Sequence, residues 1–188
     1  MNYVLLGGST NWSKILIKNF NLQKHKLKFT SSRFLDKKEN IINYKKIPLK
    51  KIDFVVLSSD AKRNIEAAKY FTKKKLPIFM EKPLANSYKN YKIFKKITSL
   101  NSIYFCDYLH IYSDPIQLIK KRLKKENINN IKLYFGKKGR ERNIKASYEW
   151  LPHPLSILFY LKNQTYENVI IKYKNFINKK KKKFKNNF

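Results

Sequence analysis

Short apolar runs alternate with helical spacing of apolar residues over the first 105 residues of the chain. The runs that predict strands are residues 3–6, 27–30, 52–57, 78–80 and 103–105. Between them, apolar side chains recur every three or four residues, as on one face of a helix: Trp12, Ile15, Leu16 and Phe20; Ile65, Ala68 and Phe71; Tyr91, Phe94 and Ile97. Strands that alternate with helices in this way predict an α/β fold built on a doubly wound parallel sheet.

The rest of the chain carries weaker patterns. They predict a helix that begins near Pro115, a strand at 128–135, a buried helix at 155–161 and a last strand at 169–173. We therefore expect an α/β domain at 1–105, a truncated α+β domain at 106–178 and a basic tail at 179–188. A block of like charges repels itself, so the tail is expected to be disordered.

Charge is the most unusual feature of the composition. The 188 residues include 43 Lys and Arg against 12 Asp and Glu, a formal net charge of +31. This balance raises the hypothesis of nucleic-acid binding, because cations neutralise phosphates. All but five of the basic residues are Lys, however, and base readout and bidentate phosphate binding favour Arg. Lys is spread along the chain together with Asn, Ile, Tyr and Phe, whose codons are A/T-rich. We therefore attribute the charge to composition and expect no nucleic-acid partner, although the tail could still anchor to RNA or an anionic surface.

Three further features set the context. No apolar stretch approaches the length of about 20 residues that a membrane-spanning helix needs. The start of the chain lacks the basic region and the long apolar segment of a signal peptide. The single cysteine, Cys106, excludes a disulfide framework and a Cys-based zinc site, and we predict no metal site. We expect a cytoplasmic protein.

The turn after the first predicted strand is the first candidate binding motif. It carries Gly7, Gly8, Ser9, Thr10 and Asn11. Gly7 takes the turn position of a G-x-G-x-x-G fingerprint, in which a helix N-terminus faces a dinucleotide pyrophosphate. Ser9 and Trp12 replace its other two glycines. The turn favours a Rossmann-type dinucleotide-binding domain at 1–105, and an ordinary strand-to-helix turn is the alternative.

The ends of the second and third strands supply further candidates, because ligands of such sheets bind at the carboxyl ends of the strands. These candidates are Ser31, Ser32, Arg33, Ser58 and Ser59. An NAD site places an acidic residue near the end of the second strand, whereas Arg and hydroxyl groups suit the 2′-phosphate of NADP. We expect NADP, with NAD as the second choice; a surface role for Arg33 stays open.

Lys82 follows the fourth predicted strand, between Glu81 and Pro83. A residue that precedes proline is kept out of the α-helical region, which holds Lys82 at the end of the strand. In a chain this rich in lysine, most lysines are solvated, but the strand-end position separates Lys82 from the others. It is our candidate for a catalytic cation.

Glu149 and His153 lead into the apolar run at 155–161. If a helix has already begun there, their i, i+4 spacing places the two side chains on one face. A neutral histidine beside a carboxylate can act as a general base. The alternative is a histidine that packs at the start of a buried helix. His25 and His110 have no comparable setting in the sequence.

These motifs together resemble the Gfo/Idh/MocA oxidoreductases, the family of glucose–fructose oxidoreductase and inositol dehydrogenase. Residues 52–59, 66–68 and 79–85 are similar to the fourth strand, the following helix and the EKP signature of that family. Glu149 and His153 match its D-x-x-x-H motif, with Glu in place of Asp. The resemblance covers roughly residues 2–162.

The resemblance implies hydride transfer between NADP or NAD and a sugar, a sugar derivative or a sugar nucleotide. It implies that Lys82 bonds the reacting hydroxyl, that His153 takes or returns the proton, and that Glu149 orients the substrate or the imidazole. The residues expected to contact the cofactor are Gly7, Gly8, Ser9, Thr10, Asn11, Ser31, Ser32, Arg33, Ser58, Ser59 and Glu81.

The sequence departs from the family pattern in two further places. Asn64 stands where the family commonly has histidine, and 35 residues follow His153, which predicts a shortened substrate domain. A shortened sheet leaves an exposed edge, so a homo-oligomer that completes the sheet is one arrangement to expect. The alternative function is that of a nucleotide-binding remnant or regulator of the same family without catalysis.

Overall fold

A five-stranded parallel sheet organises the part of the chain that the computed structural model describes, which is residues 1–36, 38–98, 103–123, 131, 133 and 150–162. The strands are β1 (Asn2–Leu6), β2 (Lys26–Ser31), β3 (Phe54–Leu57), β4 (Ile78–Glu81) and β5 (Tyr104–Asp107). Their order across the sheet is β2-β1-β3-β4-β5, so the direction of winding reverses between β1 and β3. The predicted doubly wound parallel sheet is confirmed.

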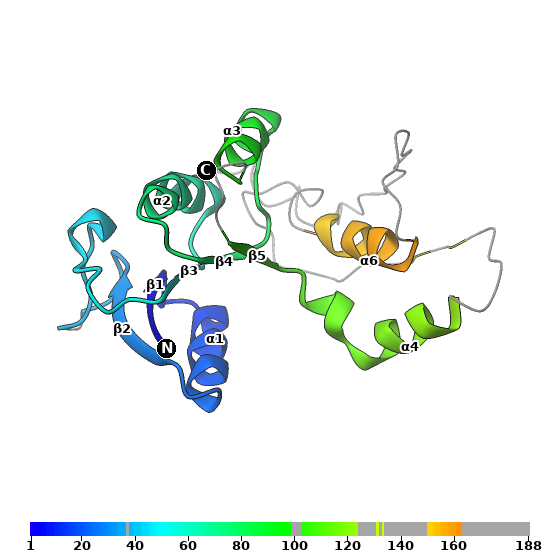
Figure 1. Ribbon diagram of the computed structural model, residues 1–188, viewed down its shortest axis with the longest axis horizontal. Helices are drawn as coiled ribbons and strands as arrows, with labels where there is room; N and C mark the ends of the chain where they lie inside the picture. The colour runs from blue at the N-terminus through cyan, green and yellow to red at the C-terminus, as the bar shows by residue number, and fades with distance from the viewer. Residues whose placement is uncertain (37, 99–102, 124–130, 132, 134–149, 163–188) are drawn as a thin grey trace, which may run out of the picture.

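Helices cover both faces of this sheet (Figure 1). They are α1 (Asn11–Leu22) on one face, and α2 (Ala61–Lys73) and α3 (Tyr88–Thr98) on the other. Each of the first two begins with a side-chain cap: the Thr10 hydroxyl accepts a hydrogen bond from the Ser13 amide, and the Asp60 carboxylate accepts one from the Arg63 amide. Each helix therefore begins at the residue that follows its cap.

Strand β1 contributes side chains to two separate hydrophobic cores. Tyr3 and Leu5 pack with α1, whereas Val4 and Leu6 belong to the larger core beneath α2 and α3. Alternate side chains of a strand point to opposite faces, so a run of apolar residues is what a strand covered on both sides requires. All four side chains are fully buried.

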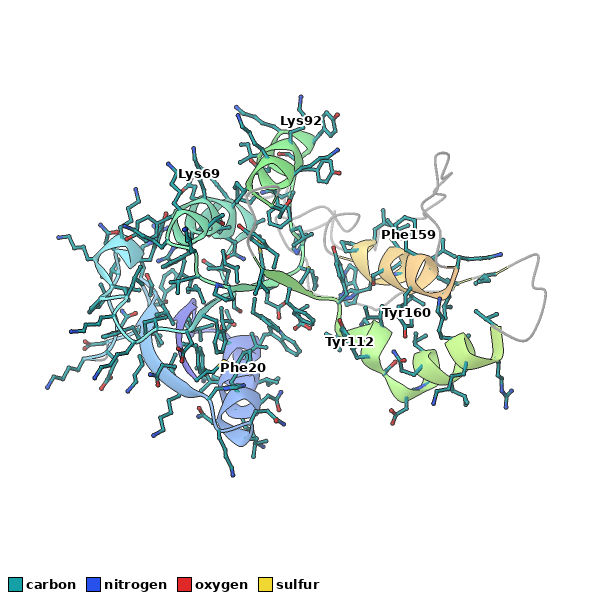
Figure 2. The ribbon with its side chains drawn as sticks, in the orientation of Figure 1. Phe20, Lys69, Lys92, Tyr112, Phe159 and Tyr160 are labelled. Carbon is teal, nitrogen blue, oxygen red and sulfur yellow. The ribbon has the colours of Figure 1, made fainter. Side chains whose placement is uncertain are left out.

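The apolar stripes of the helices match the prediction in most places. Ile65, Ala68 and Phe71 of α2 are buried, as are Phe94 and Ile97 of α3. Ile15 of α1 and Tyr91 of α3 are exceptions, with 45% and 47% of their surfaces exposed. The outer faces of the helices carry lysine: Lys69 and Lys92 point away from the sheet (Figure 2). Lysine on outward faces is consistent with a charge that reflects composition.

The connection from β2 to β3 contains a single 3-10 turn, η1 (Tyr44–Lys46), rather than an α-helix. Before it, the chain runs parallel to β2 and pairs with it at a bridge between Thr30 and Asn40. The Asn40 side chain accepts a hydrogen bond from the Ser32 amide and donates to the Ser32 carbonyl. This segment therefore occupies the outer edge of β2.

Beyond β5 lie the 3-10 helix η2 (Leu109–Tyr112), α4 (Asp114–Leu123) and α6 (Pro152–Lys162) (Figure 1). The Tyr160 hydroxyl donates to the Gln117 side chain at 2.9 Å, which fixes α6 against α4. The Lys120 ammonium donates to the carbonyl of Leu161 at 3.0 Å and so caps the last turn of α6. The helix at 155–161 was predicted correctly, but it is only partly buried within the described residues, with Phe159 39% exposed.

Several predictions fall outside the described residues. They are the strand at 128–135 apart from residues 131 and 133, the strand at 169–173, the basic tail at 179–188, and Glu149. The domain limits and the shortened substrate domain stay predictions for the same reason.

Gly7 lies at the point where β1 and β3 come closest at their carboxyl ends. Its φ is +113°, and a Cβ placed on it would lie 2.5 Å from the Ser58 carbonyl oxygen. The Gly7 amide donates to the Ser31 carbonyl at 3.0 Å, and the Ser58 amide donates to the Leu6 carbonyl at 2.9 Å. Glycine is therefore required here both for its backbone conformation and for the close approach of two strand ends.

We expect Gly7→Ala to lower the free energy of unfolding by about 3 kcal/mol, because the methyl group combines backbone strain with a clash against backbone atoms. Gly8→Ala is the matched control. Gly8 also has a positive φ, of +103°. The nearest atom to a Cβ placed on Gly8 would be the Leu35 Cδ1 at 3.0 Å, the flexible end of a side chain. Urea unfolding followed by circular dichroism should show a smaller loss for this control, about 1–2 kcal/mol. Equal losses would contradict the steric part of the explanation.

Candidate active site

A pocket with a volume of about 490 Å³ lies where the carboxyl ends of β3 and β4 meet α1, η2 and α6. Its lining is Trp12, Ser58, Ser59, Glu81, Lys82, Leu109, His110, Trp150 and His153. Five predicted site residues therefore meet in one place, although they are up to 95 positions apart in the chain. A second pocket of about 550 Å³, between the end of α1 and the start of β2, contains none of the predicted site residues.

The turn from β3 to α2 is held by Asn64. Its side-chain oxygen accepts a hydrogen bond from the Ser59 amide at 3.0 Å, and its side-chain nitrogen donates to the Ser59 carbonyl at 3.1 Å. Asn64 is buried and sits in the first turn of α2. An amide can satisfy both a donor and an acceptor of the same backbone residue, so Asn64 fixes Ser58 and Ser59 at the pocket.

Hydroxyl groups join this turn to the glycine turn. The Ser13 hydroxyl lies 2.9 Å from the Thr10 hydroxyl and 3.3 Å from the Ser58 hydroxyl. Ser13 is fully buried, so the two turns share one internal network. The Thr10 side chain therefore both caps α1 and takes part in this network.

The end of β4 carries a buried pair of carboxyl groups. Glu81 pairs in register with Asp107 of β5, and the two residues are 7% and 8% exposed. Burial and the hydrogen bond with Asp107 raise the pKa of Glu81 to about 8, against the opposing effects of Trp12 and Lys82. The Glu81 carboxyl group is therefore mostly protonated at pH 7 and can donate a hydrogen bond to Asp107.

Trp12 binds this pair from the other side of the pocket. Its indole nitrogen donates to the Glu81 carboxyl group. Trp12 occupies the third glycine position of the fingerprint, where a small residue lets a helix pack closely on a strand. Here the indole ring instead extends from α1 to β4 and forms part of the pocket wall.

His153 lies at the start of α6 and faces Lys82 and His110. It is 4% exposed, and its ring meets that of His110 edge to face at a centroid distance of 4.6 Å. Burial, followed by the positive charges of Lys82 and His110, lowers the pKa of His153 to about 4. The imidazole is therefore neutral at pH 7 and able to accept a proton.

The peptide bond between Lys82 and Pro83 is cis.

His110 and Trp150 are pocket residues that the sequence patterns did not single out. His110 belongs to the short 3-10 helix η2, which has no helical repeat to reveal it. Trp150 lies two residues before the start of α6, and its ring centroid is 6.2 Å from that of His153. The one feature of the sequence that could have indicated Trp150 as a pocket residue is its position three residues before His153.

The predicted residues at the end of β2 lie outside the pocket lining. Ser31 is fully buried, and its hydroxyl donates to the Ile42 carbonyl at 2.8 Å. Ser32 is also buried, whereas Arg33 is exposed. The arginine that reaches this strand end from inside the fold is Arg63, which donates to the Ser31 hydroxyl at 2.9 Å. Arg63 comes from the first turn of α2, so the sequence around β2 could not indicate it.

The residues around the strand ends fit a dinucleotide cofactor in two respects. The N-terminus of α1 faces the carboxyl ends of the strands, and its first turn has no acidic residue. Free amides and the helix dipole favour a pyrophosphate there. The end of β2 has no carboxylate before Asp36 and has Arg33 and Arg63 nearby, a set of donors that suits a 2′-phosphate.

Within the described ranges, none of the helices combines the length and apolar content needed to cross a membrane. In the same part of the chain, no three His, Cys, Asp or Glu side chains gather in a way that could hold a metal ion.

Neither a protein-family model nor a curated protein matches the chain by sequence. Solved structures do match by fold. A myo-inositol 2-dehydrogenase from Lactobacillus plantarum has a TM-score of 0.60 and 19% identity, over 70% of this chain and 43% of that one. The apo scyllo-inositol dehydrogenase from Lactobacillus casei has a TM-score of 0.69 and 14% identity, over 86% of this chain and 54% of that one.

A third match is an oxidoreductase from Agrobacterium radiobacter in complex with NAD+, L-tartaric acid and magnesium. Its TM-score is 0.55 and its identity 13%, over 66% of this chain and 40% of that one. At these identities the likeness shows the fold alone, which is a Rossmann-like α/β fold. The chain spans about half the length of the solved structures that it matches.

The buried carboxyl pair predicts how stability depends on pH. The pKa of Glu81 is raised in the folded state, from 4.5 to about 8, so between these values the folded protein holds a proton that the unfolded chain has released. The free energy of unfolding therefore falls as pH rises through this window, by about 1 kcal/mol per pH unit. In Glu81→Gln the amide does not titrate, and this slope should disappear.

Urea unfolding between pH 7 and 8.5 isolates the effect of Glu81. His153, whose pKa is lowered from 6.5 to about 4, adds an opposite slope only at lower pH, where the unfolded chain binds the extra proton. The control is Glu66→Gln, which removes an exposed carboxylate of α2 and should keep the wild-type slope. A wild-type slope in Glu81→Gln would show that the Glu81 carboxyl group is not the source of the slope.

Proposed function

We propose that the chain is an NAD(P)-dependent oxidoreductase that exchanges a hydride with a hydroxyl-bearing or carbonyl carbon of a sugar, sugar derivative or sugar nucleotide. The observation that carries this proposal is the meeting of Lys82 and His153 in one pocket, at the strand ends where a doubly wound sheet binds its ligands. A cation and a neutral base on the same pocket wall are the two groups that oxidation of an alcohol needs.

Lys82 would hydrogen-bond the reacting oxygen and stabilise the negative charge that develops on it. His153, neutral at pH 7 because its pKa is about 4, would accept the hydroxyl proton in oxidation and return it in reduction. A bound nicotinamide ring supplies or receives the hydride at its C4 atom. Trp12, Leu109 and Trp150 line the same pocket and would exclude water from the reacting atoms. Glu149 would orient the substrate or the imidazole, as the family resemblance implies.

The proposed cofactor is NADP rather than NAD. Two arginines near the end of β2, Arg33 and Arg63, suit a 2′-phosphate, and the sequence has no carboxylate between the end of β2 and Asp36. Arg63 uses one terminal nitrogen for Ser31 and Ile42, and the planar guanidinium has further donors. The glycine turn and Ser58–Ser59 would hold the pyrophosphate side of the cofactor.

Binding of NADPH and NADH, measured by nicotinamide fluorescence and calorimetry, tests this proposal. We expect NADPH to bind more tightly than NADH, and oxidation of NADPH or reduction of NADP to occur with members of a panel of sugars, inositols and sugar nucleotides. Binding of neither cofactor would refute the proposal. Binding without turnover on the panel would support the alternative, a nucleotide-binding protein without catalysis.

Variants of the two proposed catalytic residues separate chemistry from binding. Lys82→Ala and His153→Asn should lower kcat roughly a hundredfold or more, while the Kd for NADPH stays within a few-fold. Lys89→Ala is the control for the lysine, since Lys89 is exposed on α3. Wild-type kcat in either proposed catalytic variant would refute its role.

A further inference from the structure

A second histidine faces the proposed base. His110, the second residue of η2, places its ring against the ring of His153 at 4.6 Å between centroids and 81° between planes. Both residues line the pocket. The two come from elements that follow the sheet and are 43 positions apart, so the contact depends on how η2 and α6 pack.

The two rings make an edge-to-face contact, in which the edge of one ring lies against the face of the other. Such a contact fixes the rotation of a ring about its side-chain bonds. His110 is itself held by its backbone: the Ser113 amide and the Ser113 hydroxyl both donate to the His110 carbonyl, at 3.2 and 2.8 Å.

Charged groups face His153 from each element packed around it. Lys82 and Glu81 lie at the end of β4, and His110 comes from η2. On α4, Lys120 reaches the last turn of α6, at the opposite end from His153, and Lys162 also lies at that far end. The positive charges that act on His153 are therefore Lys82 and His110, and both lower its pKa.

We propose that His110 is a positioning residue for His153: its ring holds the His153 imidazole in place in the pocket that Lys82 also lines. The electrostatic interaction between the two imidazoles accompanies this contact and lowers the pKa of His153. The kinetic part of this proposal rests on the proposed function, but the coupling between the two rings does not. Two substitutions separate packing from charge. His110→Phe keeps a ring of similar size and removes the charge, whereas His110→Ala removes both.

The first measurement is an NMR titration of the imidazole resonances of the full-length chain. The sequence contains three histidines, His25, His110 and His153, so each resonance can be assigned from single variants. In the wild type we expect His153 to titrate near pH 4. In His110→Phe its midpoint should move to higher pH, because a repulsive charge has been removed. An unchanged midpoint would overturn the electrostatic part of the proposal.

The second measurement is kcat with the substrate and cofactor identified by the panel. His110→Ala should lower kcat roughly tenfold or more, because the base loses its fixed orientation, while His110→Phe should keep kcat at pH 7 within about threefold. The acid limb of the pH profile in His110→Phe should move to higher pH together with the NMR midpoint. Wild-type kcat in His110→Ala would overturn the positioning role.

His25→Phe is the matched control. His25 packs against Phe20 and Phe54 at the other end of α1, away from the pocket, so the variant should leave both the His153 titration and kcat unchanged. If the wild type turns over no substrate, the proposed function fails, and the titration of His110→Phe still decides whether the two rings are coupled. A shift of the midpoint in His25→Phe equal to that in His110→Phe would refute a specific contact.

Discussion

The close approach of β1 and β3 at their carboxyl ends is the constraint on which the rest of the structure depends. Gly7 has no side chain, and a Cβ placed on it would lie 2.5 Å from the Ser58 carbonyl oxygen. The winding of the sheet reverses between these two strands, so their ends form the crevice in which α/β sheets bind ligands. Ser13 and Asn64 then fix the two turns from within. The pocket is thus a consequence of how tightly two buried strands pack.

Desolvation sets the charges inside this pocket. The chain carries +31 overall, yet two of the groups that line the pocket, the His153 imidazole and the Glu81 carboxyl group, are mostly neutral at pH 7. Both shifts have burial as their first cause. The surrounding lysines, such as Lys69 and Lys92, point outward into solvent (Figure 2). Screening in water limits their effect on the pocket, so the overall charge and the chemistry of the site are largely separate properties.

The sequence predicted the sheet well because its strands are covered on both faces and must be continuously apolar. It also indicated that Ser58, Ser59, Glu81 and Lys82 would lie near one another, since residues at the carboxyl ends of parallel strands converge on one edge, and all four line the pocket. Their roles as site residues stay predictions. It could not predict contacts that join distant segments, such as Trp12 with Glu81 or Arg63 with Ser31. His110 was missed because η2 is a short 3-10 helix without a repeat. Ile15 was predicted to be buried because it follows the helical period, but it is exposed because it lies at the margin of the face that α1 buries.

Lys82 links the two unusual titrations of the pocket. Its positive charge lowers the pKa of Glu81 and also that of His153, so it makes the acid stronger and the base weaker. For the acid, burial and the bond with Asp107 outweigh this effect, and the Glu81 carboxyl group stays mostly protonated at pH 7. For the base, burial and Lys82 act in the same direction, and the imidazole stays neutral. The pocket therefore concentrates its positive charge at the lysine, which is where an oxygen that gains negative charge would be stabilised most.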